Sequence, residues 1–272
     1  TIGIYISAGT NQTANNNTVS NMSIDGAGSS STMYGIQTTG TTVVKNNNTI
    51  FNLQCIKTSG TGALYGIYNF ATPTNETVNN NSVYNLTHNG TGIVYGIFHS
   101  TATGTRTMSG NTIHTITGAG TTIAGINSAS SSPNIFKNKI YNIQSTSTGN
   151  ATVSGIIQGA LGTAGTANIY NNLIGDLKAP SSGISAATAP AVRGINITTT
   201  NTSTNLFVSY NTIYLNASSS AANFGTAGIF VTASATSTTA NLTMRNNIIF
   251  NTSTAAGTGR TVAYQRSSTD LA

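Results

Sequence analysis

The chain has 272 residues, of which 5% are charged and 38% are apolar. Its net charge of +6 comes from ten Lys and Arg that are spread along the whole sequence, against four acids. Without a basic cluster we expect no nucleic-acid partner. No run of about 18 apolar residues occurs, so we expect no membrane insertion. The single Cys55 excludes an internal disulfide and a Cys-based metal site, and we expect it to be buried and unreactive.

A repeat of about 32 residues organises the sequence, and a Gly-Ile pair marks each period. The pairs begin at Gly3, Gly35, Gly66, Gly96, Gly125, Gly155, Gly194 and Gly228. Such self-similarity is typical of a solenoid, in which each repeat is completed by its neighbours. We therefore predict one elongated domain over residues 1–272. Because the pattern is already present at Thr1 and continues to Tyr264, we expect this domain to be a segment of a longer repeat protein.

A second signature is an Asn that is followed two residues later by an aliphatic residue. It begins at Asn17, Asn48, Asn81, Asn111, Asn138, Asn172, Asn211 and Asn246. In one copy Val83 and Leu86 lie three residues apart, so a strand with alternating side chains must turn between them if both face inward. We place the turn at Asn85 and its equivalents, because Asn tolerates the left-handed backbone conformation.

Stacking of the repeats in register would place equivalent Asn side chains above one another. Such columns pair their amides along the solenoid axis, so a buried polar corner is satisfied without charge. The first column would contain the Asn residues of the second signature. A second column is expected at the turns, with Thr115 and Asp176 in place of Asn in two periods, and otherwise Asn21, Asn52, Asn85 and Asn142. The last two periods lack this turn spacing, and we expect a changed corner there.

Three short strands per period, separated by Asn or Gly corners, predict an all-β fold. We expect a single parallel β-helix, or β-solenoid, of about eight coils, right-handed as parallel crossovers usually are. A helical solenoid is disfavoured because Thr, Ser, Asn, Gly and β-branched residues dominate and strong helix formers are scarce. A β-propeller is disfavoured because each period has too few apolar runs for four strands.

Groups that could support catalysis are scarce. The acids are Asp25, Glu76, Asp176 and Asp270, each in a different period and at a different position within it. We therefore expect no carboxylate pair spaced for glycoside hydrolysis and no acidic cluster for a calcium-assisted lyase. The histidines also occupy different phases of the repeat, which favours surface or space-filling roles over zinc binding: His88, His99 and His114. We predict no enzymatic activity, no cofactor and no metal site.

One set of aromatic residues invites a functional interpretation. The position directly before the turn Asn, such as Asn85, is expected to face outward. It holds Phe51, Tyr84, His114, Tyr141 and, beyond Gly175, Tyr214. An exposed stripe of rings could contact the sugars of a polysaccharide. A second such stripe precedes the Gly of the first signature, at Tyr34, Tyr65 and Tyr95. Stacked rings also stabilise neighbouring strands, by about 0.2–1 kcal/mol per pair, and we favour that structural role.

Several segments carry a resemblance to a known family. They are NNNTIFNL at 46–53, NNNSVYNL at 79–86, YNTIYLNAS at 210–218, the YGI strands, and the closing RNNIIFNTSTAAGTGRTVAYQRSSTDLA. The chain resembles, over essentially its whole length, the very long β-helix repeat proteins that gliding Bacteroidetes-type bacteria export by type IX secretion. The closing segment is the most specific part. This resemblance implies an adhesin-like protein at the cell surface or secreted, with a carboxy-terminal sorting domain outside these residues.

We therefore expect a non-enzymatic, extracellular structural or adhesin β-solenoid that serves as a stalk or fibre segment. Its expected partners are flanking repeats of the same chain or like subunits. One alternative is binding of a cell-surface or environmental polysaccharide along the aromatic positions. Another is end-to-end stacking into an extracellular filament, because unpaired terminal strands can template one another. Specific recognition is expected in the loops, of which the longest lies between Leu177 and Val192.

Overall fold

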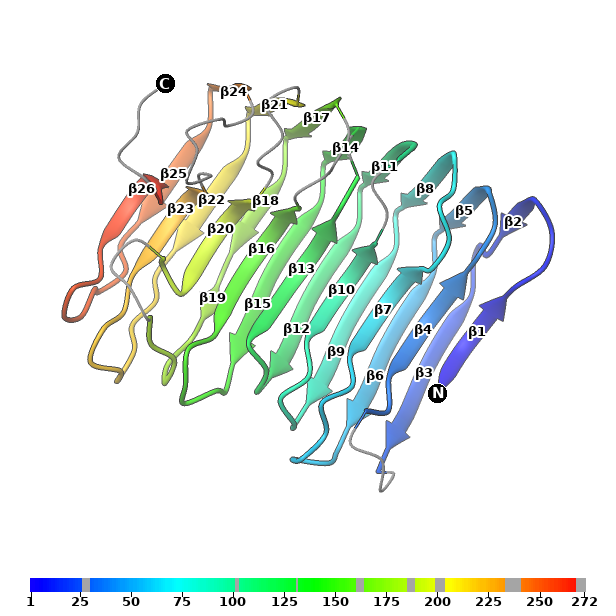
Figure 1. Cartoon of the computed structure of the whole chain (residues 1–272), viewed down its shortest axis with the longest axis horizontal. Coiled ribbons are helices and arrows are strands. Elements are labelled where there is room, and N and C mark those ends of the chain that lie inside the picture. The colour runs from blue at the N-terminus through cyan, green and yellow to red at the C-terminus, as the bar shows by residue number, and fades with distance from the viewer. Residues whose placement is uncertain are drawn as a thin grey trace.

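The computed structural model describes residues 1–25, 30–100, 103–130, 132–159, 164–184, 189–198, 204–232 and 241–267. Its regular elements within these ranges are β-strands, which stack in parallel into three sheets around a common axis (Figure 1). The predicted parallel β-helix with a period of about 32 residues is confirmed. Within the same ranges, no helix is long and apolar enough to span a bilayer.

The first sheet carries the Gly-Ile signature and has nine strands. In stacking order they are β1 (Ile2–Ile6), β4 (Met33–Thr38), β7 (Leu64–Asn69), β10 (Val94–His99), β13 (Thr122–Ser128), β16 (Thr152–Gln158), β20 (Val192–Ile197), β23 (Thr226–Val231) and β26 (Thr261–Arg266). Each strand pairs in parallel with its equivalents in the adjacent coils, so equivalent side chains form columns along the axis.

The second sheet has eight strands, most of them shorter than those of the first sheet, and each leads into an Asn of the second signature. They are β2 (Asn11–Thr13), β5 (Thr42–Asn46), β8 (Asn75–Asn79), β11 (Thr105–Ser109), β14 (Ser132–Phe136), β17 (Gly165–Tyr170), β21 (Thr204–Ser209) and β24 (Asn241–Arg245).

The third sheet follows the Asn signature. Its strands are β3 (Thr18–Ile24), β6 (Thr49–Cys55), β9 (Ser82–His88), β12 (Thr112–Gly118), β15 (Lys139–Ser145), β18 (Leu173–Gly175), β22 (Thr212–Leu215) and β25 (Ile248–Asn251), with β19 (Leu177–Lys178) also paired to β15.

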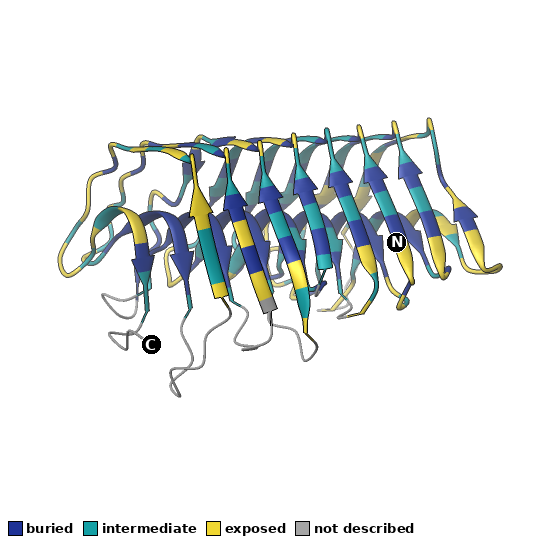
Figure 2. Cartoon of the chain, turned by 90° about the horizontal axis from the view of Figure 1, so that it is seen from above, coloured by how far each residue is buried: buried dark blue, intermediate teal, exposed yellow. Residues whose placement is uncertain are grey.

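The interior is a continuous stack of aliphatic side chains to which all three sheets contribute. Buried stretches recur along the strands of successive coils (Figure 2). In the third sheet Val83, Ile113 and Ile140 are completely buried. Burying each such side chain contributes about 1.5–3 kcal/mol. Cys55 is buried as expected, and this burial raises the pKa of its thiol to about 11. The thiol is therefore protonated and unreactive at neutral pH.

The corners of each coil are made by residues in the left-handed conformation. At the turn within the third sheet, φ lies between 51° and 58° for Asn21, Asn52, Asn85, Thr115, Asn142 and Asp176. This is the turn that the spacing of Val83 and Leu86 predicts. In the last two coils, β22 and β25 have four residues each, where most strands of the sheet have seven, and neither contains a left-handed residue. The corner of these coils is changed, as expected.

The Gly of the Gly-Ile pair is required by a close approach of two sheets. A Cβ at Gly125 would lie 2.5 Å from Ile140 Cγ2 of the third sheet and 2.8 Å from the carbonyl oxygen of Gly155 in the next coil. Equivalent contacts recur at the same position in the other coils. The repeated glycine therefore lets a β-branched side chain of the third sheet pack directly on the backbone of the first.

We predict that Gly125→Ala lowers the free energy of unfolding by about 1–3 kcal/mol, because the added methyl overpacks the core against Ile140. The matched control is Gly149→Ala, since a Cβ at Gly149 meets nothing closer than Ser147 Oγ at 3.7 Å. Its effect should stay within about 0.5 kcal/mol. Denaturant unfolding of the two variants checks this, and equal effects would contradict the close-approach explanation.

Candidate functional site

The first Asn column runs through the interior corner between the second and third sheets. Asn81 donates from its backbone N and from Nδ2 to Asn111 Oδ1, both at 2.9 Å, and from Nδ2 to the Lys45 carbonyl at 2.8 Å. Its own Oδ1 accepts the same pair of hydrogen bonds from Asn48. Each buried amide is therefore fully satisfied by the coils above and below it, with no charge in the corner.

The structure corrects one member of this column. Asn211 donates to Asn247 Oδ1, at 3.0 Å from both its backbone N and Nδ2, so Asn247 and not Asn246 occupies the eighth position. Asn246 instead has a φ of 52°. It belongs to a set of left-handed residues that precede the column in every coil: Asn16, Asn47, Asn80, Gly110, Lys137, Asn171, Tyr210 and Asn246. In the last coil an aliphatic residue, Ile248, directly follows the column Asn. The preceding Asn246 therefore also stands two residues before an aliphatic residue, and the pattern selected it instead.

The second Asn column lies at the outer turn and is partly exposed. Asn52 Nδ2 donates to Asn21 Oδ1 at 2.9 Å, and Asn85 continues the series by donating to Asn52. After the substitution at Thr115, Asn142 Nδ2 donates to the Thr115 hydroxyl at 3.1 Å. This column orders the turn but does not close the core.

A buried charge cluster lies inside the solenoid at the corner between the first and second sheets. It consists of Lys45, Glu76 and Arg106 on β5, β8 and β11, together with His99 on β10. All four are at most 4% exposed. Lys45 Nζ lies 2.6 Å from Glu76 Oε1, and His99 Nδ1 lies 2.6 Å from Glu76 Oε2. Arg106 Nε donates to His99 Nε2 at 2.7 Å.

The remaining donors of the cluster are also engaged. Lys45 Nζ donates to the Thr38 hydroxyl at 3.1 Å, and Arg106 donates to the carbonyls of Thr105 and Thr103. Burial alone would raise the pKa of the Glu76 carboxyl, but the Lys45 charge, together with the electrostatic and hydrogen-bond interactions with His99 and Lys45, outweighs it and holds that pKa well below its usual range. Glu76 is therefore ionised, and the cluster is an internal ion network that solvent and substrates do not reach.

Sequence reasoning missed this cluster because it treated the acids and cations one at a time. The register pairs Val43 with Glu76 and Glu76 with Arg106, so all three occupy one inward column of the second sheet. Lys45 occupies the neighbouring inward column, opposite Val78. The available signal was charged residues at inward positions of successive coils, where the repeat otherwise places aliphatic side chains.

The predicted aromatic column is present on the outside of the third sheet. The rings of Phe51, Tyr84, His114 and Tyr141 stack with centroids 4.8–5.1 Å apart and planes within 9° of parallel. Because each ring covers the face of the next, the two inner rings, Tyr84 and His114, present only their edges to solvent. Gly175 follows Tyr141 in register, and Tyr214 follows Gly175, so one ring is missing from the stack. Beyond it Tyr214 stacks on Phe250 at 5.8 Å, which adds one member to the predicted set.

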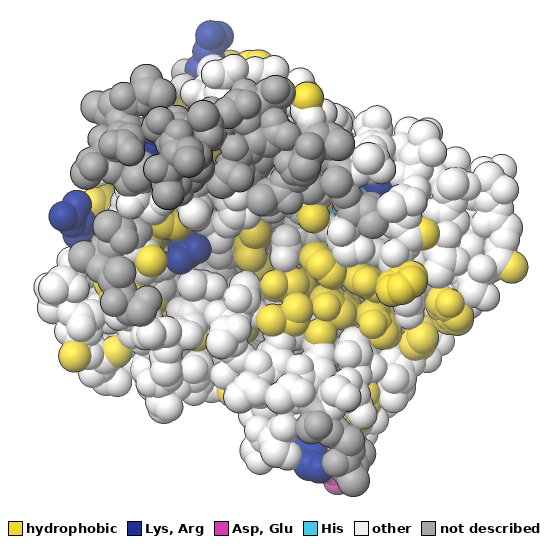
Figure 3. Space-filling model, viewed as in Figure 1, with side chains coloured by type: hydrophobic (Ala, Val, Ile, Leu, Met, Phe, Trp, Pro, Cys, Tyr) yellow, Lys and Arg dark blue, Asp and Glu magenta, His cyan; other side chains and the backbone are white. Residues whose placement is uncertain are grey.

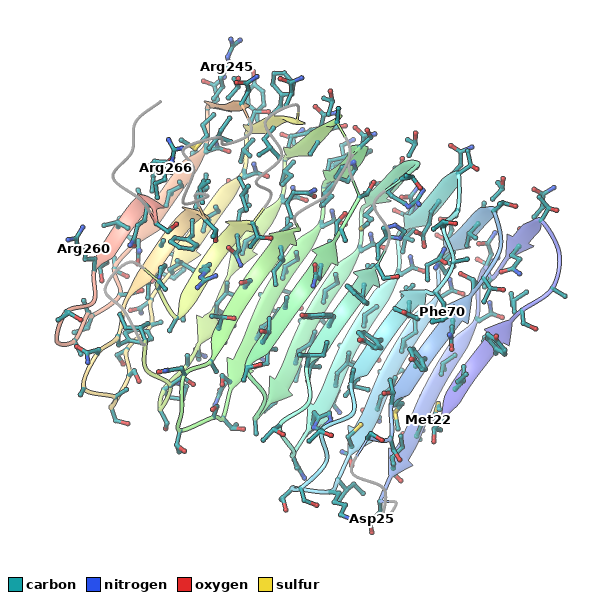
Figure 4. The ribbon with its side chains drawn as sticks, viewed as in Figure 1. Met22, Asp25, Phe70, Arg245, Arg260 and Arg266 are labelled. Atoms are coloured by element: carbon teal, nitrogen blue, oxygen red, sulfur yellow. The ribbon has the colours of Figure 1, made fainter. Side chains whose placement is uncertain are left out.

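The second aromatic stripe is not an exposed platform. Tyr65 and Tyr95 are 8% and 6% exposed, because the rings of Tyr68 and Phe98, which lie three residues further along the same two strands, pack against them. The rings of Tyr65 and Tyr68 lie 4.9 Å apart, and those of Tyr65 and Phe98 lie 5.2 Å apart. Figure 3 shows the resulting apolar patch on the outer face over β4, β7 and β10. Phe70, at its margin, is 64% exposed (Figure 4).

The other described acids and His88 lie outside the buried charge cluster. Asp25 is exposed, and Asp176 forms a partly exposed ion pair with Lys178 at 2.6 Å (Figure 4 shows Asp25). His88 is buried, with Nε2 2.7 Å from the Gly62 carbonyl. Asp270 lies outside the described residues. Among the residues that are described, no group of three or more His, Cys, Asp or Glu could hold a metal ion.

The long loop region contributes a wide surface hollow of about 490 Å³. Its described lining mixes small polar residues with Ile184, Ala221 and Ala222, and includes no titratable side chain. Residues 185–188 of the loop between Leu177 and Val192 lie outside the described ranges.

Comparisons of the chain with protein-family models, with curated proteins and with solved structures yield no match.

We predict that Glu76→Gln lowers the free energy of unfolding by about 3–5 kcal/mol, because it leaves Lys45 and Arg106 buried without a counter-charge. Asp25→Asn removes one carboxylate charge at an exposed position and should change stability by less than about 0.5 kcal/mol. Denaturant unfolding measures both, and a Glu76→Gln variant as stable as the Asp25 variant would show that the cluster does not stabilise the fold.

The same cluster predicts acid sensitivity. The pKa of Glu76 is lower in the folded chain than its ordinary value of 4.5, so the unfolded chain takes up this proton first. The stabilisation is therefore present at pH values above the ordinary pKa of 4.5 and begins to be lost as the pH approaches that value from above. Thermal unfolding of the parent protein should show this loss between about pH 5 and pH 2, and Glu76→Gln should lack it. Parallel pH profiles for the two proteins would contradict the assignment.

Proposed function

We propose that this chain is a non-enzymatic structural segment of an adhesin-like protein displayed outside the cell, where its stacked coils act as part of a stalk or fibre. The observation that carries the proposal is the unbroken first Asn column. Paired hydrogen bonds of 2.9–3.1 Å join each coil to the next from Asn17 to Asn247. This column and three continuous sheets make each coil depend on its neighbours, as a rigid rod requires.

The chemistry of the described surface supports the same proposal. The Glu76 carboxylate is enclosed with its cations, Asp25 stands alone on the surface, and Asp176 is paired with Lys178. No two of these acids share a site, which disfavours acid–base hydrolysis. The location outside the cell rests on the resemblance to exported repeat proteins described above.

An antibody raised against the folded chain tests the location. We expect it to label intact cells of the producing organism, or to find the chain in the medium, without permeabilisation. Labelling that appears only after permeabilisation would overturn the proposal. A cytoplasmic protein of the same cells, probed in parallel, controls for leakage.

Polysaccharide binding along the aromatic column is the second candidate function. Stacking covers both faces of Tyr84 and His114, so these two residues offer a ligand only their edges. Carbohydrates stack on ring faces, through the apolar C–H groups of the sugar. The missing ring at Gly175 leaves two faces uncovered, and it is this observation that favours the candidate.

A further inference from the structure

The missing ring leaves a slot in the aromatic column. Adjacent strands in a sheet are about 4.8 Å apart, so Tyr141 and Tyr214, which lie two strands apart, are separated by about 10 Å. That is twice the 4.8–4.9 Å between successive rings in the filled column from Tyr84 to Tyr141. The slot has a volume of about 250 Å³ and an apolar lining. It therefore has the dimensions of one planar ring stacked between two others.

The walls of the slot are two tyrosine faces. One face of Tyr141 is covered by His114, whose ring is within 9° of parallel to it, so the other face borders the slot. Tyr214 is 45% exposed, and its far side is covered by Phe250. Gly175 forms the floor and contributes no side chain. We call this site, bounded by Tyr141, Gly175 and Tyr214, the ring slot.

The edge of the ring slot carries a cation. Lys139 Nζ lies 4.9 Å from the centroid of the Tyr141 ring. Lys139 also belongs to the lining of the slot. No carboxylate of the described residues is within ion-pair distance of Lys139, since Asp176 is paired with Lys178 and Glu76 is in the interior. Asp176 also lines the slot, where Lys178 neutralises its carboxylate. The slot therefore combines apolar walls with the Lys139 ammonium, which has no counter-ion among the described residues, in a chain of net charge +6.

We propose that the ring slot binds one uronic acid residue of an acidic polysaccharide, with its pyranose ring between Tyr141 and Tyr214 and its carboxylate on Lys139. A pyranose has apolar C–H faces and a polar edge, which match the walls and the rim. An unsubstituted aromatic ring would fit the walls but would leave the ammonium without a counter-charge. Lys139 can swing from the ring face to the edge, since its four-carbon stem is flexible. This inference rests on the carbohydrate-binding candidate and names its site and ligand class.

Calorimetric titration with two oligosaccharides of the same length and linkage tests the ligand class. One is built of mannuronic acid and the other of mannose, so that they differ in the carboxylate. The mannuronic acid oligosaccharide should bind, and the mannose oligosaccharide should bind roughly tenfold more weakly, as expected for loss of one charge-assisted contact. Equal binding of the two would overturn the uronic acid assignment. Binding of phenol together with failure of both sugars would assign the slot to aromatic side chains instead.

Variants of the slot test its position. Tyr214→Ala and Lys139→Gln should each weaken binding of the mannuronic acid oligosaccharide roughly tenfold. Gly175→Tyr should abolish binding, because the new ring completes the column and fills the slot. Gly175→Ala is its matched control, since a Cβ at Gly175 has its nearest contact at 3.3 Å, to the Tyr214 carbonyl oxygen, and leaves the slot open. Tyr170→Ala removes an outward ring that stacks on Phe136 in the second sheet, and should bind as the parent protein does.

The outcomes separate the slot from the wider candidate function. If Tyr84→Ala weakens binding while the three slot variants bind normally, the column binds carbohydrate and the ring slot does not. If the parent protein binds neither oligosaccharide, this ligand assignment fails, while a screen of other polysaccharides still decides the carbohydrate-binding candidate. Far-ultraviolet circular dichroism of each variant, compared with the parent protein, verifies that a loss of binding does not arise from unfolding.

Discussion

The structure depends on register between neighbouring coils. A coil of this solenoid cannot close its own core, because its inward side chains pack on those of the coils above and below. The first Asn column enforces the register at one corner. The sequence distance between hydrogen-bonded Asn partners varies from 27 to 39 residues, yet the Nδ2–Oδ1 distances remain between 2.9 and 3.0 Å. Loops absorb the variation in length, so the hydrogen-bond geometry of the corner stays the same although the coils differ in their number of residues.

The buried charge cluster shows how this architecture accommodates a departure from its aliphatic pattern. Glu76 could not stand alone in the interior, because an unpaired buried carboxylate costs several kcal/mol. Lys45 from the preceding coil and Arg106 from the following coil supply the compensating charges, and His99 supplies a further contact. Register is therefore the condition for the cluster as well as for the Asn column. A shift of one coil relative to the next would leave each of these charges unpaired.

The sequence predicts the fold well because its signals are local and repeated. The interval between Val83 and Leu86 is sufficient to place the left-handed turn at Asn85, and the recurrence of the signature gives the stacking. Contacts between columns are harder to predict. Glu76 meets His99 only because the end of β10 faces the start of β8 across a corner, and no spacing rule states that. The burial of Tyr65 likewise depends on rings from neighbouring coils. The ring slot was missed because it arises from the absence of a side chain at Gly175, whereas sequence motifs are recognised by the side chains that are present.

The account attributes stability to coupling between adjacent coils, and native-state hydrogen exchange of Asn138→Ala tests this most directly. Asn138 joins Asn111 of the preceding coil to Asn172 of the following one. Loss of its side chain should lower amide protection in β12, β15 and β18, while β1, β4 and β7, which lie in coils further from Asn138, retain the protection of the parent protein. A uniform loss of protection across all strands, or no loss in the coils next to Asn138, would contradict nearest-neighbour coupling through the Asn column.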